Sequence, residues 1–193
     1  MYRFIVLVLT VVLQACSTTG VSNYSYNLDV PEQRYSFFDF KNIGDAVTLE
    51  INATFIEQRK TPEWNPSASF QIFSKDENVY AALVIPNSEG SGYQPFLISN
   101  TKNPKTGEIS SIEPVYFAET IDFSASFTVT VTWFTPGVLR VTLNNNETKT
   151  IPIDFVVDKL RSANSSGEIE VRSLVINKCN KSKHSDAASC AGI

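Results

Sequence analysis

The chain has 193 residues, a formal net charge of −4 at pH 7 and a single histidine. An acidic surface repels phosphate backbones, so the composition argues against nucleic-acid binding. The histidine, His184, lies in a polar stretch near the C-terminus. A serine or cysteine nucleophile would therefore have no credible histidine base, which argues against the triad hydrolases.

Residues 1–15 have the pattern of an export signal. Arg3 gives a short positive start, and Phe4 to Leu13 is an apolar run broken only by Thr10. At 1.5 Å per residue, this run is about half as long as a bilayer span requires. We therefore expect a signal peptide that is removed, not a permanent transmembrane helix.

The end of this segment is the sequence LQAC, which resembles the lipobox of bacterial lipoproteins in Leu13, Ala15 and Cys16. The resemblance implies that Cys16 becomes the mature N-terminus and carries a diacylglyceryl group and an acyl chain such as palmitate. Several acyl chains together give a stable membrane anchor. Ser17 stands where an Asp would imply inner-membrane retention, so we expect the outer membrane in a Gram-negative source. The alternatives are an ordinary secretory signal that carries a cysteine, or a buried N-terminal strand.

The rest of the chain divides into three predicted parts. Residues 16–34 start with small polar side chains, and we interpret them as the lipidated N-terminus and a flexible tether. Residues 35–178 suit a single domain, because no second Pro-, Gly- or Ser-rich linker divides them. Residues 179–193 form a polar C-terminal tail.

Two segments of the domain alternate strictly between apolar and polar side chains. In residues 46–55 the apolar positions run from Val47 to Phe55, with Thr48, Glu50, Asn52 and Thr54 between them. Residues 127–133 repeat the pattern, which places Trp133 in the core. Period-two alternation is typical of half-buried strands. Pro136 and Gly137 then predict a turn into a further strand.

Seven further segments are predicted as short strands separated by turn clusters. They are residues 35–40, 67–74, 79–85, 94–99, 113–119, 149–155 and 168–176. Helical periodicity is almost absent; residues 155–162 are the exception and predict one helical turn or a short crossover. The fold class expected is all-β, an antiparallel two-sheet β-sandwich.

The run from residue 127 to 155, followed by residues 167–177, resembles the second half of concanavalin A-like and laminin G-like jelly rolls. In those folds a long strand leads through a turn to a strand that ends in an Asn- or Gly-rich bend, here NNN at residues 144–146. A late strand then closes the sheet. The resemblance implies a jelly-roll fold over residues 35–178 and says less about function.

Once Cys16 is assigned to lipid, Cys179 and Cys190 remain as an even pair. An exported chain meets an oxidising compartment, so we predict a disulfide that closes the polar tail. The alternative is a zinc site formed by these cysteines with His184 and Asp186, but the paired ligand spacing of structural zinc sites is missing. We predict no metal and no cofactor.

Catalysis is not expected, and the sequence contains no nucleotide-binding or zinc-protease motif. Glu168 and Glu170 lie two residues apart and share a strand face, as the acids of jelly-roll glucanases do. The glucanase pattern requires a third acid where this chain has Ser173. We prefer the interpretation that these residues form a solvated face, on which Arg172 pairs with Glu170. The strand that carries them is also expected to be the last one in the chain, not a central one.

The predicted function is a non-catalytic envelope lipoprotein whose sandwich binds an extended glycan. Trp64, in a Pro-bounded loop, and Tyr93, after a Gly- and Ser-rich turn, are the candidate ligand-binding residues, because aromatic rings stack on sugars. Either ring could instead fold back over the rim of the core. The alternatives are a structural lipoprotein that binds another envelope protein and a glycoside hydrolase. We expect the protein to contact the membrane through the lipid anchor at Cys16.

Overall fold

The computed structural model describes residues 21–44, 46–62, 65–86, 94–122, 124–134 and 137–178. These residues form eleven strands and no helix. The strands are β1 (Val21–Lys41), β2 (Ala46–Gln58), β3 (Ser67–Phe73), β4 (Val79–Pro86), β5 (Phe96–Lys102), β6 (Ile109–Ser111), β7 (Val115–Tyr116), β8 (Ser126–Phe134), β9 (Gly137–Leu143), β10 (Glu147–Ile153) and β11 (Lys159–Lys178). Over the described part of the chain there is accordingly no helix that could serve as a membrane span.

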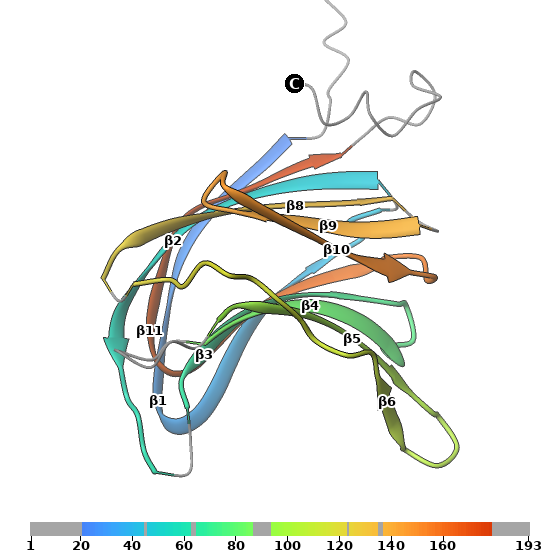
Figure 1. Cartoon of the computed structure of the whole chain (residues 1–193), viewed down its shortest axis with the longest axis horizontal. Coiled ribbons are helices and arrows are strands. Elements are labelled where there is room, and N and C mark those ends of the chain that lie inside the picture. Colours follow the sequence, from blue (N-terminus) through green and yellow to red (C-terminus); the bar gives the residue numbers. More distant parts are fainter. Residues whose placement is uncertain are drawn as a thin grey trace, which may run out of the picture.

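The strands form one antiparallel ladder that curls into two layers, so the predicted all-β sandwich is confirmed. The order along the ladder is β10-β9-β8-β2-β11-β3-β4-β5-β6, with β1 beside β11 and β7 beside β5. Figure 1 shows β2, β8, β9 and β10 in an upper layer, and β3, β4, β5 and β6 in a lower layer. The long strands β1 and β11 bend and belong to both.

β1 runs beside β11 from Val21 opposite Asn177 to Lys41 opposite Lys159, with an interruption at the bend. β11 pairs with β2 through residues 167–178 and with β3 through residues 159–165. The first and last strands of the chain therefore hold the two layers together.

The bend of β11 depends on a tight approach to β2. Ser166 has a positive φ of 47°, and its Oγ accepts a hydrogen bond from the backbone N–H of Gln33 at 2.7 Å. A Cβ built on Gly167 would lie 2.4 Å from the backbone oxygen of Glu57. Only glycine fits at this position without movement of the neighbouring strand.

The core lies between the layers and is built by the predicted alternation. Trp133 is fully buried and donates from Nε1 to the backbone oxygen of Gly44 at 3.0 Å, which satisfies its only polar atom. The opposite phase of β2 and β8 carries polar side chains, of which Glu50 is exposed, whereas Thr54 and Thr132 are buried. The inward side chains of these two strands are Val47, Leu49, Ile51, Ala53, Phe55, Phe127, Val129, Val131 and Trp133.

The flexible tether predicted for residues 16–34 is wrong from Val21 onward, because β1 starts there and pairs with β11. Leu28 and Val30 are buried, whereas most other side chains of β1 are exposed. β1 is an edge strand with a neighbour on one side only, so a polar sequence is tolerated. The sandwich therefore starts fourteen residues before the predicted boundary at residue 35. Residues 16–20 lie outside the described residues.

The helical turn predicted as one alternative for residues 155–162 is also absent. Residues 154–158 instead form the short crossover that was the other alternative, and β11 begins at Lys159. The predicted strand 168–176 is the second half of β11, and its peripheral placement was wrong, since β11 lies between β2 and β3 in the ladder. The first half was hard to recognise because Ser162, Asn164 and Ser165 are polar yet buried.

Candidate functional site

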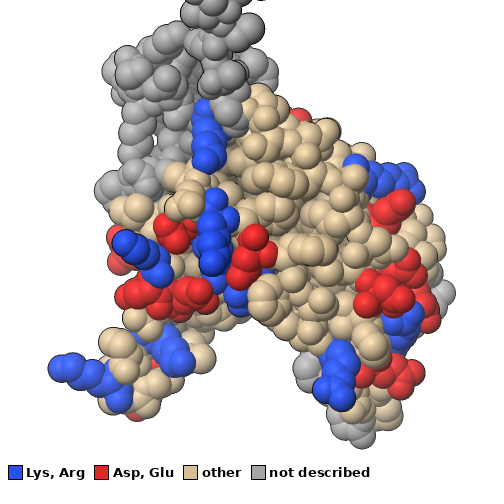
Figure 2. All heavy atoms as spheres, turned by 180° about the vertical axis from the view of Figure 1, so that it is seen from behind, with Lys and Arg blue, Asp and Glu red and all other residues tan. Residues whose placement is uncertain are grey.

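The outer surface of the lower layer is hollowed, and we call it the concave face. Figure 2 shows the hollow on the lower side of the molecule, between two projections. One projection is the β5–β6 hairpin, and the other is the bend of β1 with the chain that follows β2 (Figure 1). The strand registers place these side chains on this face: Tyr35, Phe37, Asp39 and Lys41; Lys159, Arg161, Ala163 and Ser165; Ser67, Ser69, Gln71 and Phe73; Tyr80, Ala82 and Val84; Phe96, Ile98, Asn100 and Lys102; Tyr116.

One row of ladder partners crosses the concave face from edge to edge. In order, the row contains Phe37, Ala163, Ser69, Val84, Phe96 and Tyr116. Phe37 stands at one end of the row, and Phe96 and Tyr116 stand at the other. The three residues between Phe37 and Phe96 have smaller side chains. Strands lie about 4.8 Å apart, so β1 and β5 are separated by about 19 Å. The row therefore forms a low floor between two aromatic ends.

Charged side chains lie beside this floor at the β1 end. Arg161 lies directly opposite Asp39, and its Nε donates to Oδ1 at 2.7 Å and its Nη2 to Oδ2 at 2.9 Å. Lys159 is almost fully buried, and its Nζ lies 2.6 Å from Glu77 Oε1 and 3.6 Å from Asp39 Oδ2. Each carboxylate is thus held by a cation, as a partly desolvated charge requires.

Aromatic rings pack directly on the two cations. The Arg161 guanidinium carbon lies 3.9 Å from the centroid of the Phe37 ring and 5.0 Å from that of Phe73. Lys159 Nζ lies 4.5 Å from the centroid of the Phe73 ring. These cation–π contacts fix the ring of Phe37 on one side. Phe37 nevertheless remains 45% exposed.

Tyr35 lies beside Phe37, with 5.8 Å between the ring centroids, and extends the aromatic surface along β1. Gln71 Nε2 donates to the Tyr35 hydroxyl at 3.5 Å and to Ser69 Oγ at 2.7 Å. Partial burial raises the pKa of Tyr35, so the hydroxyl keeps its proton at neutral pH. The hydrogen bonds from Arg161 lower the pKa of Asp39, so that group stays ionised.

The other end of the face carries a second set of aromatic and amide side chains. The rings of Phe96 and Tyr116 have centroids 5.5 Å apart, and Tyr116 is 53% exposed. Asn100 Nδ2 donates to the Tyr80 hydroxyl, and Ser111 Oγ donates to Asn100 Oδ1. Both ends of the face thus combine a ring with hydrogen-bonding groups.

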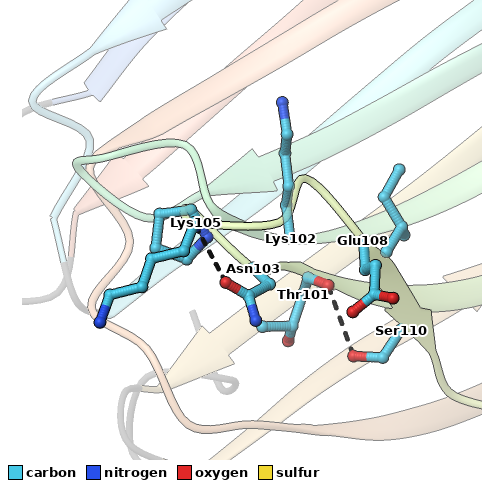
Figure 3. A pocket seen from close by; sticks show the side chains of 8 residues that line it. Thr101, Lys102, Asn103, Lys105, Glu108 and Ser110 are labelled. Atoms are coloured by element: carbon cyan, nitrogen blue, oxygen red, sulfur yellow. Dashed lines mark hydrogen bonds between the residues drawn. The ribbon is translucent and has the colours of Figure 1, made fainter.

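The β5–β6 hairpin forms one wall and contains a hollow of its own, shown in Figure 3. Asn103 Oδ1 accepts a hydrogen bond from the backbone N–H of Lys105 at 2.9 Å, which shapes the turn. The side chains of Lys102, Lys105 and Glu108 spread in different directions and do not converge on one point (Figure 3). The hollow lies along a single hairpin, and its residues are Thr101, Lys102, Asn103, Pro104, Lys105, Glu108, Ile109 and Ser110.

Glu168 and Glu170, the pair weighed for catalysis, lie in the upper layer, away from the concave face. Glu170 Oε2 accepts a hydrogen bond from Arg172 Nε at 2.9 Å, which confirms the predicted pairing. Arg172 also donates to Ser126 Oγ at 3.0 Å. Within the described ranges, no group of three or more His, Cys, Asp or Glu residues could hold a metal ion.

The other predicted site residues lie outside the described residues. They are the candidate ligand-binding residues Trp64 and Tyr93, the lipidation site Cys16, and the cysteine pair Cys179 and Cys190. The alternative zinc ligands His184 and Asp186 fall in the same C-terminal segment. These assignments remain predictions from sequence.

The sequence-based search missed the aromatic and charged residues at the β1 end of the face. A signal was present in YSFFDF, residues 35–40, where aromatic side chains occupy both phases of one strand. A strand with one face in the core needs aromatic residues on one phase only. The second phase, Tyr35 and Phe37, was the feature that could have pointed to a surface site.

The fold is a jelly-roll β-sandwich of the concanavalin A-like kind, as predicted. No family model and no curated protein matches the sequence. Three solved structures illustrate the likeness. β-Agarase A in complex with oligoagarose is 11% identical, with a TM-score of 0.60 over 80% of this chain and 72% of that chain. Congerin II with lactose and MES is 15% identical, with a TM-score of 0.52 over 74% of this chain and 100% of that one.

The third is galectin-Ib from Xenopus laevis, 14% identical, with a TM-score of 0.51 over 74% of this chain and 100% of that one. At such identities the likeness establishes the fold alone. Enzymes and non-enzymes share it, so function has to be argued from the concave face itself.

Proposed function

We propose that this protein is a non-catalytic envelope lipoprotein whose concave face binds an extended glycan. The observation that carries the proposal is the row from Phe37 to Tyr116, in which partly exposed rings stand at both ends of a floor of small side chains. A ring can stack on the apolar face of a sugar, and the neighbouring polar groups can bind its hydroxyls.

The polar groups at the β1 end suit sugar hydroxyls because they are held in place before a ligand arrives. Asp39 is fixed by two hydrogen bonds from Arg161, and Gln71 is fixed by Ser69 and Tyr35. Preorganised side chains lose little conformational entropy on binding. The agarase and congerin structures, with oligoagarose and lactose, support a glycan as ligand for this fold.

The carboxylates of the concave face do not favour hydrolysis. A retaining or inverting glycosidase requires one carboxyl group that is protonated and can act as an acid. Asp39 forms an ion pair with Arg161, and Glu77 forms one with Lys159. The hydrogen bonds from Arg161 lower the pKa of Asp39. The ionised Asp39 can accept hydrogen bonds from hydroxyls but cannot donate a proton to a leaving group.

The envelope role rests on the LQAC sequence that ends at Cys16. We include in the proposal that Cys16 is acylated and that the protein is anchored in the outer membrane. Mass spectrometry of the native protein tests this directly, because an acylated Cys16 as first residue gives a defined mass. An intact N-terminus from Met1, or an unmodified Cys16, would contradict the anchor.

The glycan proposal is tested with two variants of adjacent phenylalanines. Phe37 faces the hollow, whereas Phe38 points to the other side of β1 and packs edge-on against Tyr26, with 4.9 Å between centroids. Phe37 is 45% exposed and Phe38 is 44% exposed, so Phe38→Ala is a matched control for Phe37→Ala. A glycan array followed by calorimetry on protein starting at Ser17 should show that Phe37→Ala weakens binding about tenfold, and Phe38→Ala does not.

A second candidate function is the docking of another envelope protein on β1. It is favoured by the free edge of this strand, which borders both layers, and by the exposure of Tyr24 and Phe38 along it. Absence of binding to every glycan at millimolar concentration would move the assignment to this candidate. In that case Phe38→Ala should weaken capture of a partner from the envelope.

A further inference from the structure

The distance between the predicted anchor and the sandwich is much shorter than the sequence suggested. β1 begins at Val21, only five residues after Cys16. A chain of five residues spans at most about 17 Å even when fully extended. A domain that covers Val21 to Lys178 has a radius of gyration of about 15 Å, which corresponds to a diameter of about 40 Å. The connection is therefore less than half as long as the domain is wide.

The chain enters and leaves the sandwich at the same place. Val21 lies opposite Asn177 in the ladder, and β11 ends one residue later at Lys178. Lys178 Nζ donates to the backbone oxygen of Asn42 at 2.6 Å, so the loop after β1 also reaches this end. In Figure 1 the start of β1 and the end of β11 are at the top of the molecule, whereas the hollow opens at the bottom, as Figure 2 shows.

We infer that the acylated Cys16 holds the sandwich against the bilayer by the end at which β1 starts and β11 finishes, so that the concave face opens away from that bilayer. The inference rests on the proposed anchor at Cys16. To turn the hollow toward the lipid, the anchor would have to reach around the domain, over a distance of at least about 40 Å. A connection of about 17 Å permits tilting but does not permit that inversion.

The residues at this end suit the headgroup region. Val21 is 58% exposed, Tyr24 is 40% exposed, and Lys178 is an exposed cation. Tyrosine is enriched at membrane interfaces, and a lysine can place its methylene groups along apolar surface with the amine in water. The ligand of the concave face is then a glycan in the space beyond the membrane, not a sugar headgroup of the bilayer that carries the protein.

The orientation can be measured on the full acylated protein in vesicles of phosphatidylethanolamine and phosphatidylglycerol that contain a headgroup-labelled acceptor lipid. A donor dye is attached to a cysteine introduced by Asn23→Cys, near the anchored end, or by Lys105→Cys, at the tip of the β5–β6 hairpin. Both positions are exposed. Energy transfer to the lipid should be several-fold more efficient from position 23 than from position 105.

A chain with fifteen Gly and Ser residues inserted between Gly20 and Val21 provides the control, because it should reduce the difference between the two positions. In the chain without the insertion, the transfer efficiencies from positions 23 and 105 could be equal or reversed while the mass confirms acylation of Cys16. That result would overturn the orientation and leave the proposed anchor standing. An unmodified Cys16 would overturn both and would be seen in the mass before any transfer is measured. Glycan binding by the concave face is tested separately and is unaffected by either outcome.

Discussion

Asp39 and Arg161 are 122 positions apart in the sequence and face each other across β1 and β11 through two parallel hydrogen bonds of 2.7 and 2.9 Å. The guanidinium presents two N–H groups along one edge to the two carboxylate oxygens, and its central carbon lies over the ring of Phe37. One ion pair therefore positions a carboxylate and an aromatic ring at the β1 end of the concave face.

This pair predicts how stability depends on pH. The pKa of Asp39 is lowered in the folded protein, mainly by the hydrogen bonds from Arg161. The pair thus stabilises the fold above the unfolded pKa of about 3.9, and its contribution is lost as the pH falls below about 4. Asp39→Asn should cost about 1 to 2 kcal/mol at pH 7 and progressively less below pH 4.

Thermal unfolding of both proteins between pH 7 and pH 2 measures the effect. Asp154→Asn is the control, since Asp154 is exposed and has no ion pair among the described residues. A difference between Asp39→Asn and the natural chain that stays constant down to pH 2 would show that the pair does not link stability to protonation.

The bend of β11 predicts a strong effect of a small substitution. Gly167→Ala places a methyl group 2.4 Å from the backbone oxygen of Glu57, so β2 and β11 must separate locally. Overpacking of this kind costs about 1 to 3 kcal/mol, and the rigid neighbour is backbone, so we expect the upper part of that range. In Gly107→Ala the methyl group meets nothing within 4 Å.

Urea unfolding compares the two variants. Gly107 has a φ of +75°, so its substitution should cost only the conformational strain of about 1 kcal/mol. Equal losses in the two variants would mean that the strands at the bend can move apart freely.

Much of the fold could be predicted because alternation reports burial directly. The apolar phase of residues 46–55 and 127–133 became the core of β2 and β8. The first part of β1 was missed because an edge strand needs few apolar side chains, and only Leu28 and Val30 of it are buried. The first half of β11 was missed because the polar residues Ser162 and Asn164 occupy buried positions. Asn164 Nδ2 donates to the backbone oxygens of Gly167, nearby in the chain, and of Leu28, 136 positions away, and the second bond leaves no local pattern in the sequence.

The candidate site was far less predictable. Which phase of a strand faces a hollow depends on how the sheet curves, and a sequence does not state that curvature. The pairing of Asp39 with Arg161 follows from a ladder between the first and last strands, so no local pattern contains it. Trp64 was easier to notice than Phe37, because the prolines around it already indicate in the sequence that it lies outside a strand pattern.

The length of the floor predicts how affinity depends on ligand length. Phe37 and Tyr116 stand at opposite ends of the row, so only a glycan that covers the whole floor contacts both rings. Affinity should rise with the number of sugar units until both ends are reached. Tyr116→Ala should weaken binding of the longest ligand about tenfold and leave the shortest ligand nearly unaffected. A uniform loss at every length, measured by calorimetry, would argue against a second aromatic contact.

Trp64→Ala tests the loop aromatic predicted from sequence. If Trp64 stacks on a sugar, the variant should retain the melting temperature of the natural chain and bind the glycan about tenfold more weakly. An unfolded or strongly destabilised variant would instead assign this ring to the rim of the core. Circular dichroism and calorimetry on the same preparation distinguish the two roles.

Reduction of the predicted Cys179–Cys190 disulfide should leave the main unfolding transition nearly unchanged. β11 ends at Lys178, so the bond would close a loop beyond the last paired residue of the sandwich. A short closed loop restricts mainly its own segment. Scanning calorimetry with and without reductant measures this, and loss of the whole transition on reduction would show that the tail is part of the cooperative fold.

The position of β11 also determines when this protein can fold. It is the last strand of the chain, yet it lies between β2 and β3 and joins the two layers. Until it is present, β2 and β3 have no common neighbour, and the hydrogen bond from Asn27 to Glu168 must close a separation of 141 residues. Contacts this distant make folding slow. The two layers therefore have no strand in common until the last strand of the chain has been made, and the sandwich cannot close before then.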